Sequence, residues 1–381
     1  MNVLIITHEY PPIGGGGANA CMNLTGEYAK AGYQITIVTV WYDGLEEEEY
    51  SGGVRIIRLK AKRKHLAHCG FPEMLDFLWK ALHKADALCK REKFDICQVF
   101  FAIPSGPVAW CLKKKYGLPY LIRFGGGDIP GFQERFRVLY KLIGPFEKII
   151  WKQADALVAN SQGLKKLAAG FYDKKEIRII TNGVDEKWFL TGEDADIGRR
   201  SQEEIRLLFV SRLIERKGLQ FILPVLPEIS RQAGKKVTLT IVGDGPYRTV
   251  LEQITKDRHL AGSVTFAGQR EKRELPQLYR SADIFILPSQ KEGMPNVVLE
   301  AMAGGLPIVM TPCEGSLELI DGNGYAVPAE QFAEKIVCLC RDNALRRQMG
   351  ERSRQLVRER FQWSRVAAEY LKLMEAICHL S

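Results

Sequence analysis

Short runs of apolar, mostly β-branched residues recur along the chain and are separated by amphipathic stretches of helix length. In the first half these runs span residues 3–8, 35–40, 54–59, 96–101, 120–124, 156–161 and 177–182. In the second half they span residues 205–213, 237–243, 264–268, 283–289 and 307–311. Nearly continuous apolar runs that alternate with helices are typical of parallel strands buried on both faces. The pattern therefore predicts two α/β units in series.

A polar stretch with little periodicity, residues 183–204, interrupts this pattern and reads as a linker. The 381 residues are also more than one ordinary core supports. We therefore predict an N-terminal Rossmann-like domain at 1–185, a linker at 186–204 and a C-terminal Rossmann-like domain at 205–358. The remaining segment, 359–381, contains an amphipathic helix at 360–378 whose apolar face needs a partner.

Composition narrows the class of protein. Apolar residues make up 46% of the chain and charged residues 26%, which is ordinary for a soluble globular protein. The chain has no apolar run long enough to span a membrane, and its start does not resemble a signal peptide, so we expect a cytoplasmic protein. The nine cysteines and six histidines lack the spacings of disulfide frameworks or metal sites. We expect no metal and no cofactor.

The net charge of +9 includes a basic stretch, residues 54–72, with six Lys or Arg, two His and no acidic residue. Such a stretch can attract anionic lipids or a phosphorylated acceptor, and it can equally be a solvated loop. Nucleic acid is not expected as a partner, because the stretch lacks interleaved aromatic residues and no nucleic-acid-binding motif accompanies it.

Two loops that follow predicted strands carry groups suited to phosphate. After the first strand, Gly15, Gly17 and Ala20 fit a dinucleotide-binding pattern, but Pro11 and Pro12 lie between the strand end and these residues. We therefore favour a loop whose glycine backbone can bind a phosphate at close range. The alternative is a glycine loop that is needed only to form a turn. In the second half, Arg212 and Lys217 follow a strand closely enough to neutralise one anion together.

Two glutamates follow a later strand. Glu292 lies in the loop after residues 283–289, and Glu300 falls one to two turns into a helix expected to begin near Pro295. Carboxylates on separate elements, without a metal or a partnered base, suit the binding of hydroxyl groups. The alternative for Glu300 is a structural one, because the helix dipole favours an acidic residue near the helix N-terminus.

The segment "EGMPNVVLEAMA" (292–303) resembles the signature of retaining glycosyltransferases of family 4, in which seven residues separate two glutamates. The glycine loop, "TNGVDEKWF" (181–189), "SRLIERKG" (211–218), "VGDGP" (242–246) and "AGQ" (267–269) agree with it in order. This resemblance implies the α/β GT-B fold: two Rossmann-like domains facing a central cleft, with a C-terminal helix crossing back to the N-terminal domain.

The resemblance also implies roles for individual residues. Glu300 would bind the ribose of a UDP- or GDP-linked sugar, and Glu292 the hydroxyls of the transferred sugar. Arg212 and Lys217 would bind the diphosphate, together with Gly15 and Gly16 of the other domain. The remaining contacts would come from Met294, Asn296 and Val297 beside the sugar and from Gly268 and Arg270 beside the base. The resemblance implies retention of the anomeric configuration without a side-chain nucleophile, and Arg212, Lys217 and the helix N-terminus can neutralise the leaving group without a metal.

One departure from the family pattern leaves alternatives open. Family members commonly carry His-Gly-x-Asp after a first-domain strand, whereas this chain has Gly125 in the histidine's place and keeps Asp128. Asp128 or Arg123 could hold the sugar instead. A nucleotide-sugar 2-epimerase and an inactive nucleotide-sugar-binding subunit remain alternatives to a transferase. For a glycan or lipid-linked acceptor, the basic stretch and the helix from Phe71 could provide a peripheral membrane contact, or form an ordinary loop and helix.

Overall fold

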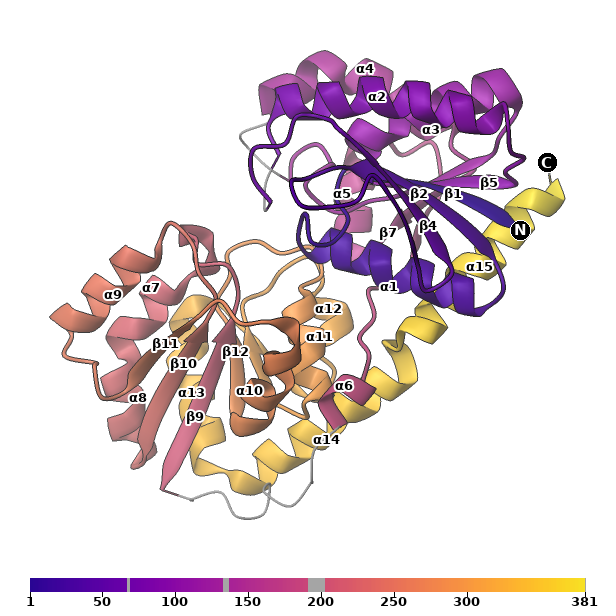
Figure 1. Ribbon diagram of the computed structural model, residues 1–381. Helices are drawn as coiled ribbons and strands as arrows, with labels where there is room; N and C mark the ends of the chain where they lie inside the picture. The colour runs from indigo at the N-terminus through magenta and orange to yellow at the C-terminus, as the bar shows by residue number, and fades with distance from the viewer. Residues whose placement is uncertain (67–68, 133–136, 191–202, 381) are drawn as a thin grey trace. The chain divides into compact units, whose positions relative to one another are not determined.

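The computed structural model describes residues 1–66, 69–132, 137–190 and 203–380. The chain divides into two compact units, each with its own sheet (Figure 1). The N-terminal unit comprises Met1–Asn182 together with Trp363–Ser381, and the C-terminal unit comprises Gly183–Gln362. Most of the predicted linker, residues 186–204, lies outside the described residues.

The sheet of the N-terminal unit has eight strands in the order β3-β4-β2-β1-β5-β6-β7-β8. The central strand β1 (Asn2–Ile6) pairs in parallel with β2 (Gln34–Val40) and β5 (Ile96–Phe100), and Ile5 lies opposite Ile37 and Gln98. The other strands are β3 (Glu48–Ser51), β4 (Val54–Leu59), β6 (Tyr120–Arg123), β7 (Ala156–Ala159) and β8 (Ile177–Ile179).

The edge strand β3 was not predicted. Its contacts correct both interpretations of the basic stretch, that of an anion-attracting patch and that of a solvated loop. It pairs antiparallel with β4, and its charged, exposed residues hide it from a search for apolar runs. Its acidic residues neutralise the basic stretch: Arg55 pairs with Glu48 at 2.6 Å, and the buried Arg58 pairs with Glu49 at 2.7 Å. The first part of residues 54–72 is therefore neither a free basic patch nor a solvated loop.

Helices cover both faces of this sheet. On one face α1 (Gly16–Lys30) packs with α15 (Trp363–Leu380), which buries Val366, Tyr370 and Met374. On the other face lie α2 (Phe71–Cys89), α3 (Ala102–Tyr116), α4 (Arg137–Gln153) and α5 (Gln162–Phe171). Both α2 and α4 pack against α3, so these three helices form one layer.

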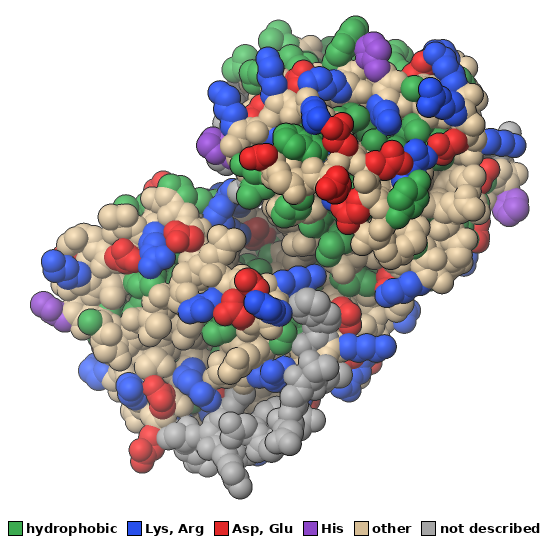
Figure 2. Space-filling view, in the orientation of Figure 1, with side chains coloured by type: hydrophobic (Ala, Val, Ile, Leu, Met, Phe, Trp, Pro, Cys, Tyr) green, Lys and Arg blue, Asp and Glu red, His purple; other side chains and the backbone are tan. Residues whose placement is uncertain are grey.

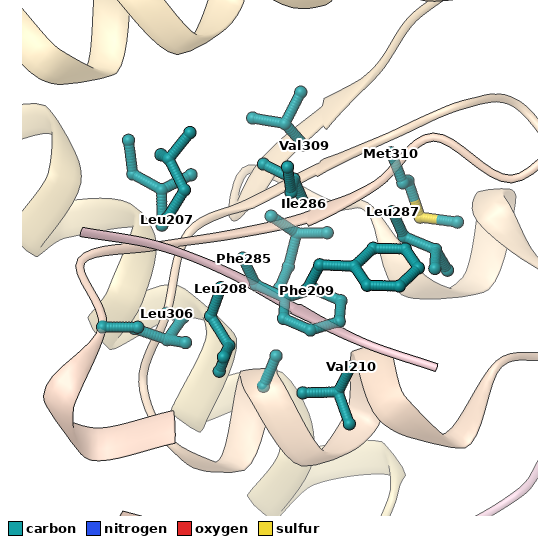
Figure 3. Packing of buried hydrophobic residues seen from close by; sticks show 14 of the residues in the cluster. Leu207, Leu208, Phe209, Val210, Phe285, Ile286, Leu287, Leu306, Val309 and Met310 are labelled. Atoms are coloured by element: carbon teal, nitrogen blue, oxygen red, sulfur yellow. The ribbon is translucent and has the colours of Figure 1, made fainter. Parts of the chain in front are cut away.

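The C-terminal unit contains a six-stranded parallel sheet in the order β11-β10-β9-β12-β13-β14. Its strands are β9 (Glu204–Val210), β10 (Lys236–Val242), β11 (Val264–Gly268), β12 (Ile284–Leu287), β13 (Ile308–Met310) and β14 (Gly324–Ala326). Phe209, Phe285 and Ile286 pack at the centre of its core (Figure 3). Every strand predicted from an apolar run is present; β3 and the short β14 were missed.

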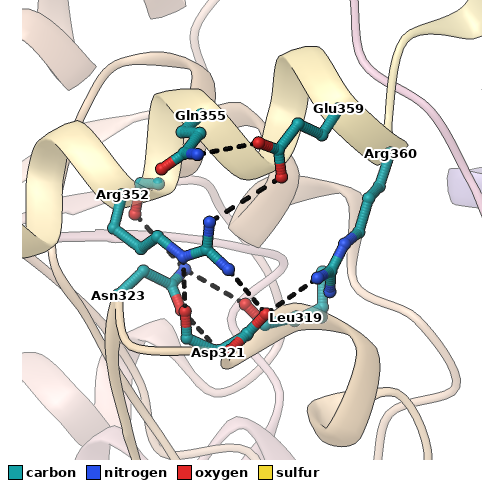
Figure 4. A network of polar contacts seen from close by, with 8 residues as sticks. Leu319, Asp321, Asn323, Arg352, Gln355, Glu359 and Arg360 are labelled. Carbon is teal, nitrogen blue, oxygen red and sulfur yellow. Dashed lines mark hydrogen bonds and ion pairs between the residues drawn. The ribbon is translucent and has the colours of Figure 1, made fainter.

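The helices of this unit are α6 (Lys187–Leu190), α7 (Leu219–Ile222), α8 (Leu226–Ala233), α9 (Arg248–Asp257), α10 (Leu275–Ser281), α11 (Asn296–Ala303), α12 (Ser316–Leu319), α13 (Phe332–Arg341) and α14 (Asn343–Arg360). An ionic network fastens α14 to the turn before β14, where Asp321 accepts from Arg352 at 2.7 Å and from Arg360 at 2.9 Å (Figure 4). The helix predicted at 360–378 begins later, at Trp363, because α14 continues to Arg360.

Candidate active site

Three polar side chains meet at the carboxyl edge of the C-terminal sheet. Lys217 ends a short 3₁₀ helix (Glu215–Lys217) after β9, and Glu292 lies in the loop after β12. Because β9 and β12 are neighbours in the sheet, these two loops meet at one edge. The Lys217 ammonium forms an ion pair with Glu292 Oε1, which also accepts from Ser289 Oγ at 2.6 Å. Both charged side chains are largely buried, with 11% and 12% exposed.

This burial changes the electrostatics of the lysine. Removal from water lowers the pKa of Lys217, and the adjacent Glu292 carboxylate opposes that effect. From the sequence, Lys217 was expected to bind the diphosphate and Glu292 the hydroxyls of the sugar. A contact between the two side chains was not predicted. Ser289 was not predicted at all, although it lies in the strand segment that points to this loop.

The loops that carry the ion pair are held together through the backbone. Gly218 has φ of +79°, and a Cβ there would lie 1.9 Å from the Pro288 carbonyl oxygen, so this position requires glycine. Arg216 is exposed, but its guanidinium donates to the Lys291 carbonyl at 2.5 Å, so it is part of the loop structure. The exposed side chain of Arg212 lies two residues past β9.

The second glutamate is held by a tyrosine. Pro295 precedes α11 as its N-cap residue, so the helix begins at Asn296, and Glu300 lies just over one turn inside it. The buried hydroxyl of Tyr279, on α10, donates to Glu300 Oε2 at 2.8 Å, and its oxygen lies 3.3 Å from the Val297 carbonyl oxygen. Burial raises the pKa of Glu300, while the Tyr279 hydrogen bond opposes that rise. Sequence patterns did not identify Tyr279, because its role depends on how α10 packs against α11.

The other ligand-binding residues predicted in the C-terminal unit differ from one another in burial and in their contacts. Met294 is buried, whereas Asn296 and Val297 are half-buried in the first turn of α11. Gly268 ends β11 with φ of +71°, and its carbonyl accepts from the Gly243 amide at 2.8 Å. Arg270 is exposed and pairs with Glu274 at 3.3 Å.

In the N-terminal unit, the glycine loop enters α1. Gly14 has φ of +95°, and a Cβ there would lie 2.5 Å from Glu9 Oε2, so packing explains this glycine. A Cβ on Gly15 would meet nothing within 4 Å. No side chain caps α1 at Gly15, and its first turn, which begins at Gly16, has no acidic residue. Packing therefore does not explain Gly15, and a ligand could approach the backbone there.

The Asp128 side chain binds backbone amides of its own unit. Its buried carboxylate accepts from the Ala102 amide at 2.6 Å and from the Gly125 amide at 2.8 Å. Burial raises the pKa of Asp128, and these amide donors oppose the rise. The contacts give Asp128 a structural role that the sequence did not predict.

An aromatic ring fills the space beside Gly125. A Cβ on Gly125 would lie 2.3 Å from Phe101 Cε1, and one on Gly17 would lie 2.4 Å from Phe101 Cζ. Phe101 itself has φ of +71°, which is unusual for a bulky residue. Its ring lies 4.8 Å from the buried ring of His8, whose pKa burial lowers to about 3. Phe101 was not predicted from the sequence, since an aromatic residue at a strand end looks like core.

Comparisons with known proteins agree with this architecture. The model of Glycosyltransferase Family 4 matches residues 14–188, and the model of Glycosyl transferases group 1 matches residues 204–342. An uncharacterised glycosyltransferase of Methanocaldococcus jannaschii is 27% identical over 97% of this chain and 96% of its own length.

Two solved structures resemble the whole chain. Sucrose-phosphate synthase from Thermosynechococcus elongatus aligns with a TM-score of 0.84 at 23% identity and covers 100% of both chains. Anabaena HepE, in complex with UDP-glucose, aligns with a TM-score of 0.75 at 18% identity and covers 99% of this chain and 100% of its own. The chain therefore belongs to the family 4 glycosyltransferases and has their GT-B fold, which consists of two Rossmann-like domains.

Proposed function

We propose that this glycosyltransferase moves a hexosyl or N-acetylhexosaminyl group from a UDP- or GDP-linked sugar to a glycan or lipid-linked acceptor, with retention of anomeric configuration. The observation that carries the proposal is the buried cluster of Lys217, Glu292 and Ser289 at the carboxyl edge of the C-terminal sheet. Ligands of open α/β sheets bind at this edge. The UDP-glucose in the related HepE structure supports a nucleotide-sugar donor.

Charge on the departing diphosphate is neutralised by cations and amides of the C-terminal unit. An ammonium has three N–H donors, and Glu292 accepts one from Lys217, so Lys217 is held in place while it binds a phosphate oxygen. Arg212 adds a forked guanidinium, and the first amides of α11, at Asn296 and Val297, add the positive end of a helix dipole. Because these groups are fixed before the reaction, they stabilise the transition state without reorganisation and without a metal.

The two glutamates bind hydroxyl groups. Glu300, oriented by Tyr279, accepts from the ribose hydroxyls, and Glu292 accepts from the transferred sugar. Gly268 and Arg270, at the end of β11, contact the base. The acceptor hydroxyl attacks the anomeric carbon on the face that the diphosphate leaves, so no side-chain nucleophile is needed, and the departing phosphate takes the hydroxyl's proton in place of a side-chain base.

A second candidate is a nucleotide-sugar-binding subunit without turnover. The observation in its favour is the Phe101 ring, which occupies the space beside Gly125, where family members carry a histidine. A 2-epimerase of the same fold is the other alternative. Release of nucleoside diphosphate only when an acceptor is supplied distinguishes a transferase from both.

The chemical nature of the acceptor determines the location in the cell at which the enzyme acts. None of the helices in the described residues is long and apolar enough to cross a membrane. We place the reaction in the cytoplasm, with a lipid-linked acceptor reached at the inner face of the membrane.

Glu292→Ala tests the proposal. A thermal-shift screen of UDP, GDP and ADP sugars first identifies the donor, because a ligand of the folded state raises its stability. The variant should then bind the nucleoside diphosphate of this donor with similar affinity but transfer sugar about 100-fold more slowly, since the contact to the reacting sugar is lost. The measurements are nucleoside diphosphate affinity by calorimetry and nucleoside diphosphate release with donor and acceptor.

The matched control is Glu228→Ala, at an exposed glutamate of α8 whose partner is Arg231. This control should transfer sugar at the wild-type rate. An unchanged rate in Glu292→Ala would remove the role assigned to Glu292, and a chain that no nucleotide sugar stabilises would contradict the proposed function itself.

A further inference from the structure

Helix α4 of the N-terminal unit has apolar residues on both its inner and outer sides. On the inner side Ile150 and Trp151 are fully buried, and the Trp151 ring lies 4.5 Å from that of Phe124. The outer side carries an apolar row at helical spacing whose members are between 41% and 76% exposed: Val138, Leu142, Phe146 and Ile149. Helix packing within the unit explains the inner side. In the outer row, the Phe146 ring packs edge-on against Trp110 of α3 at 5.4 Å and is still 41% exposed, while Val138, Leu142 and Ile149 are exposed as well.

Positive charge borders the outer row. Lys141, Lys148 and Lys152 are exposed on the same helix. The one acidic residue of α4, Glu147, is on the inner side and 1% exposed. A helix with an exposed apolar row, lysines beside it and no exposed carboxylate has the pattern of helices that lie in the interface of an anionic membrane.

The neighbouring surface has the same character. Helix α2, which packs with α4 against α3, exposes Phe71, Leu75 and Trp79 at helical spacing. Figure 2 shows hydrophobic side chains mixed with Lys and Arg, and with some acidic side chains, over the edge of the N-terminal unit that α2 and α4 form. A pocket of about 590 Å³ opens beside α4, and Lys141 and Lys148 line it with no acidic residue among its described lining. Such a pocket can accept a phosphate group.

We propose that the outer face of α4, together with the exposed row of α2, docks onto the surface of an anionic lipid bilayer. The apolar rows enter the boundary between head groups and acyl chains, and the lysines contact lipid phosphates. The first part of the basic stretch cannot supply this attraction, because Arg55 and Arg58 are already paired with glutamates. Docking brings the N-terminal unit to the surface where a lipid-linked acceptor would be found.

Vesicle sedimentation of the full-length protein tests this surface. We expect binding to phosphatidylcholine vesicles with about one third phosphatidylglycerol to be at least about tenfold tighter than to phosphatidylcholine alone. Binding should weaken at 1 M salt, where the Debye length falls to about 3 Å. Leu142→Ser with Phe146→Ser should lower binding to anionic vesicles about tenfold or more. Lys141→Glu with Lys148→Glu should remove the preference for anionic lipid.

Matched controls use exposed residues of the C-terminal unit. Leu317→Ser removes a leucine that is 75% exposed, and Lys256→Glu reverses an exposed lysine of α9. Both controls should bind vesicles as the wild type does. Urea denaturation that follows the N-terminal unit verifies that each α4 variant is folded, and nucleotide binding, measured without lipid, separates this test from that of the proposed function.

Two results would overturn the inference. The first is absence of binding to anionic vesicles, or binding that the α4 variants leave unchanged. The second is a change of oligomeric state in the Leu142→Ser and Phe146→Ser variant without any change in vesicle binding, which would assign the face to a second copy of the chain.

Discussion

At the residue scale, the contact between Gly125 and Phe101 gives a sharp prediction. Gly125→Ala should lower the free energy of unfolding by about 1–3 kcal/mol, because the added methyl group would lie 2.3 Å from the Phe101 ring. Adding Phe101→Leu should recover part of that loss, so that the double variant is more stable than the sum of the single changes predicts. Urea denaturation measures all three variants.

The control for this cycle is Gly170→Ala in α5 of the same unit. A Cβ at Gly170 meets nothing within 4 Å, so this variant should be as stable as the wild type or more stable by up to about 1 kcal/mol. If Gly125→Ala were equally harmless, the ring would not fill this space in solution.

The candidate site shows what sequence patterns reveal and what they miss. Lys217, Glu292 and Glu300 were predicted as ligands because each follows a predicted strand, and their roles stay predictions. Tyr279 and Phe101 could not be predicted, because each acts through a contact between elements far apart in the chain. The apolar runs predicted every strand buried on both faces, whereas β3 escaped because its glutamates satisfy arginines instead of filling a core.

At the element scale, α4 carries a buried acid that makes stability depend on pH. Neither carboxyl oxygen of Glu147 has a hydrogen-bond partner among the described residues. Burial, and secondarily the nearby Asp128 carboxylate, raises the pKa of Glu147 from its ordinary 4.5 to about 9. The folded protein therefore keeps Glu147 protonated across a range in which the unfolded chain releases the proton.

It follows that stability should fall as pH rises through this range. The contribution of Glu147 is fully present below pH 4.5, and each pH unit from there to about 9 should lower the free energy of unfolding by about 1.4 kcal/mol. Glu147→Gln, which cannot ionise, should flatten this dependence, whereas Glu176→Gln at an exposed position should not. Urea titrations from pH 5 to 9 measure the slopes; parallel curves for wild type and Glu147→Gln would refute the assignment.

At the scale of the whole molecule, the buried residues form clusters that do not cross between the units. One cluster lies entirely within Gly183–Gln362, and the other two use only residues of the N-terminal unit, including α15. Hydrogen exchange in urea should therefore show two opening transitions, one for each unit. Removing α15 should weaken the N-terminal transition alone, although this helix is encoded after the whole C-terminal unit.

A donor nucleotide should separate these transitions further. At about 100 times its Kd, UDP or GDP should raise the opening free energy of the C-terminal unit by about 2.7 kcal/mol, because Lys217, Arg212 and Glu300 all belong to that unit. The N-terminal unit should gain much less protection. Arg212→Ala should reduce the gain, whereas Arg231→Ala, at an exposed arginine of α8, should not. Equal protection of both units would mean that the nucleotide is held by different residues from those proposed.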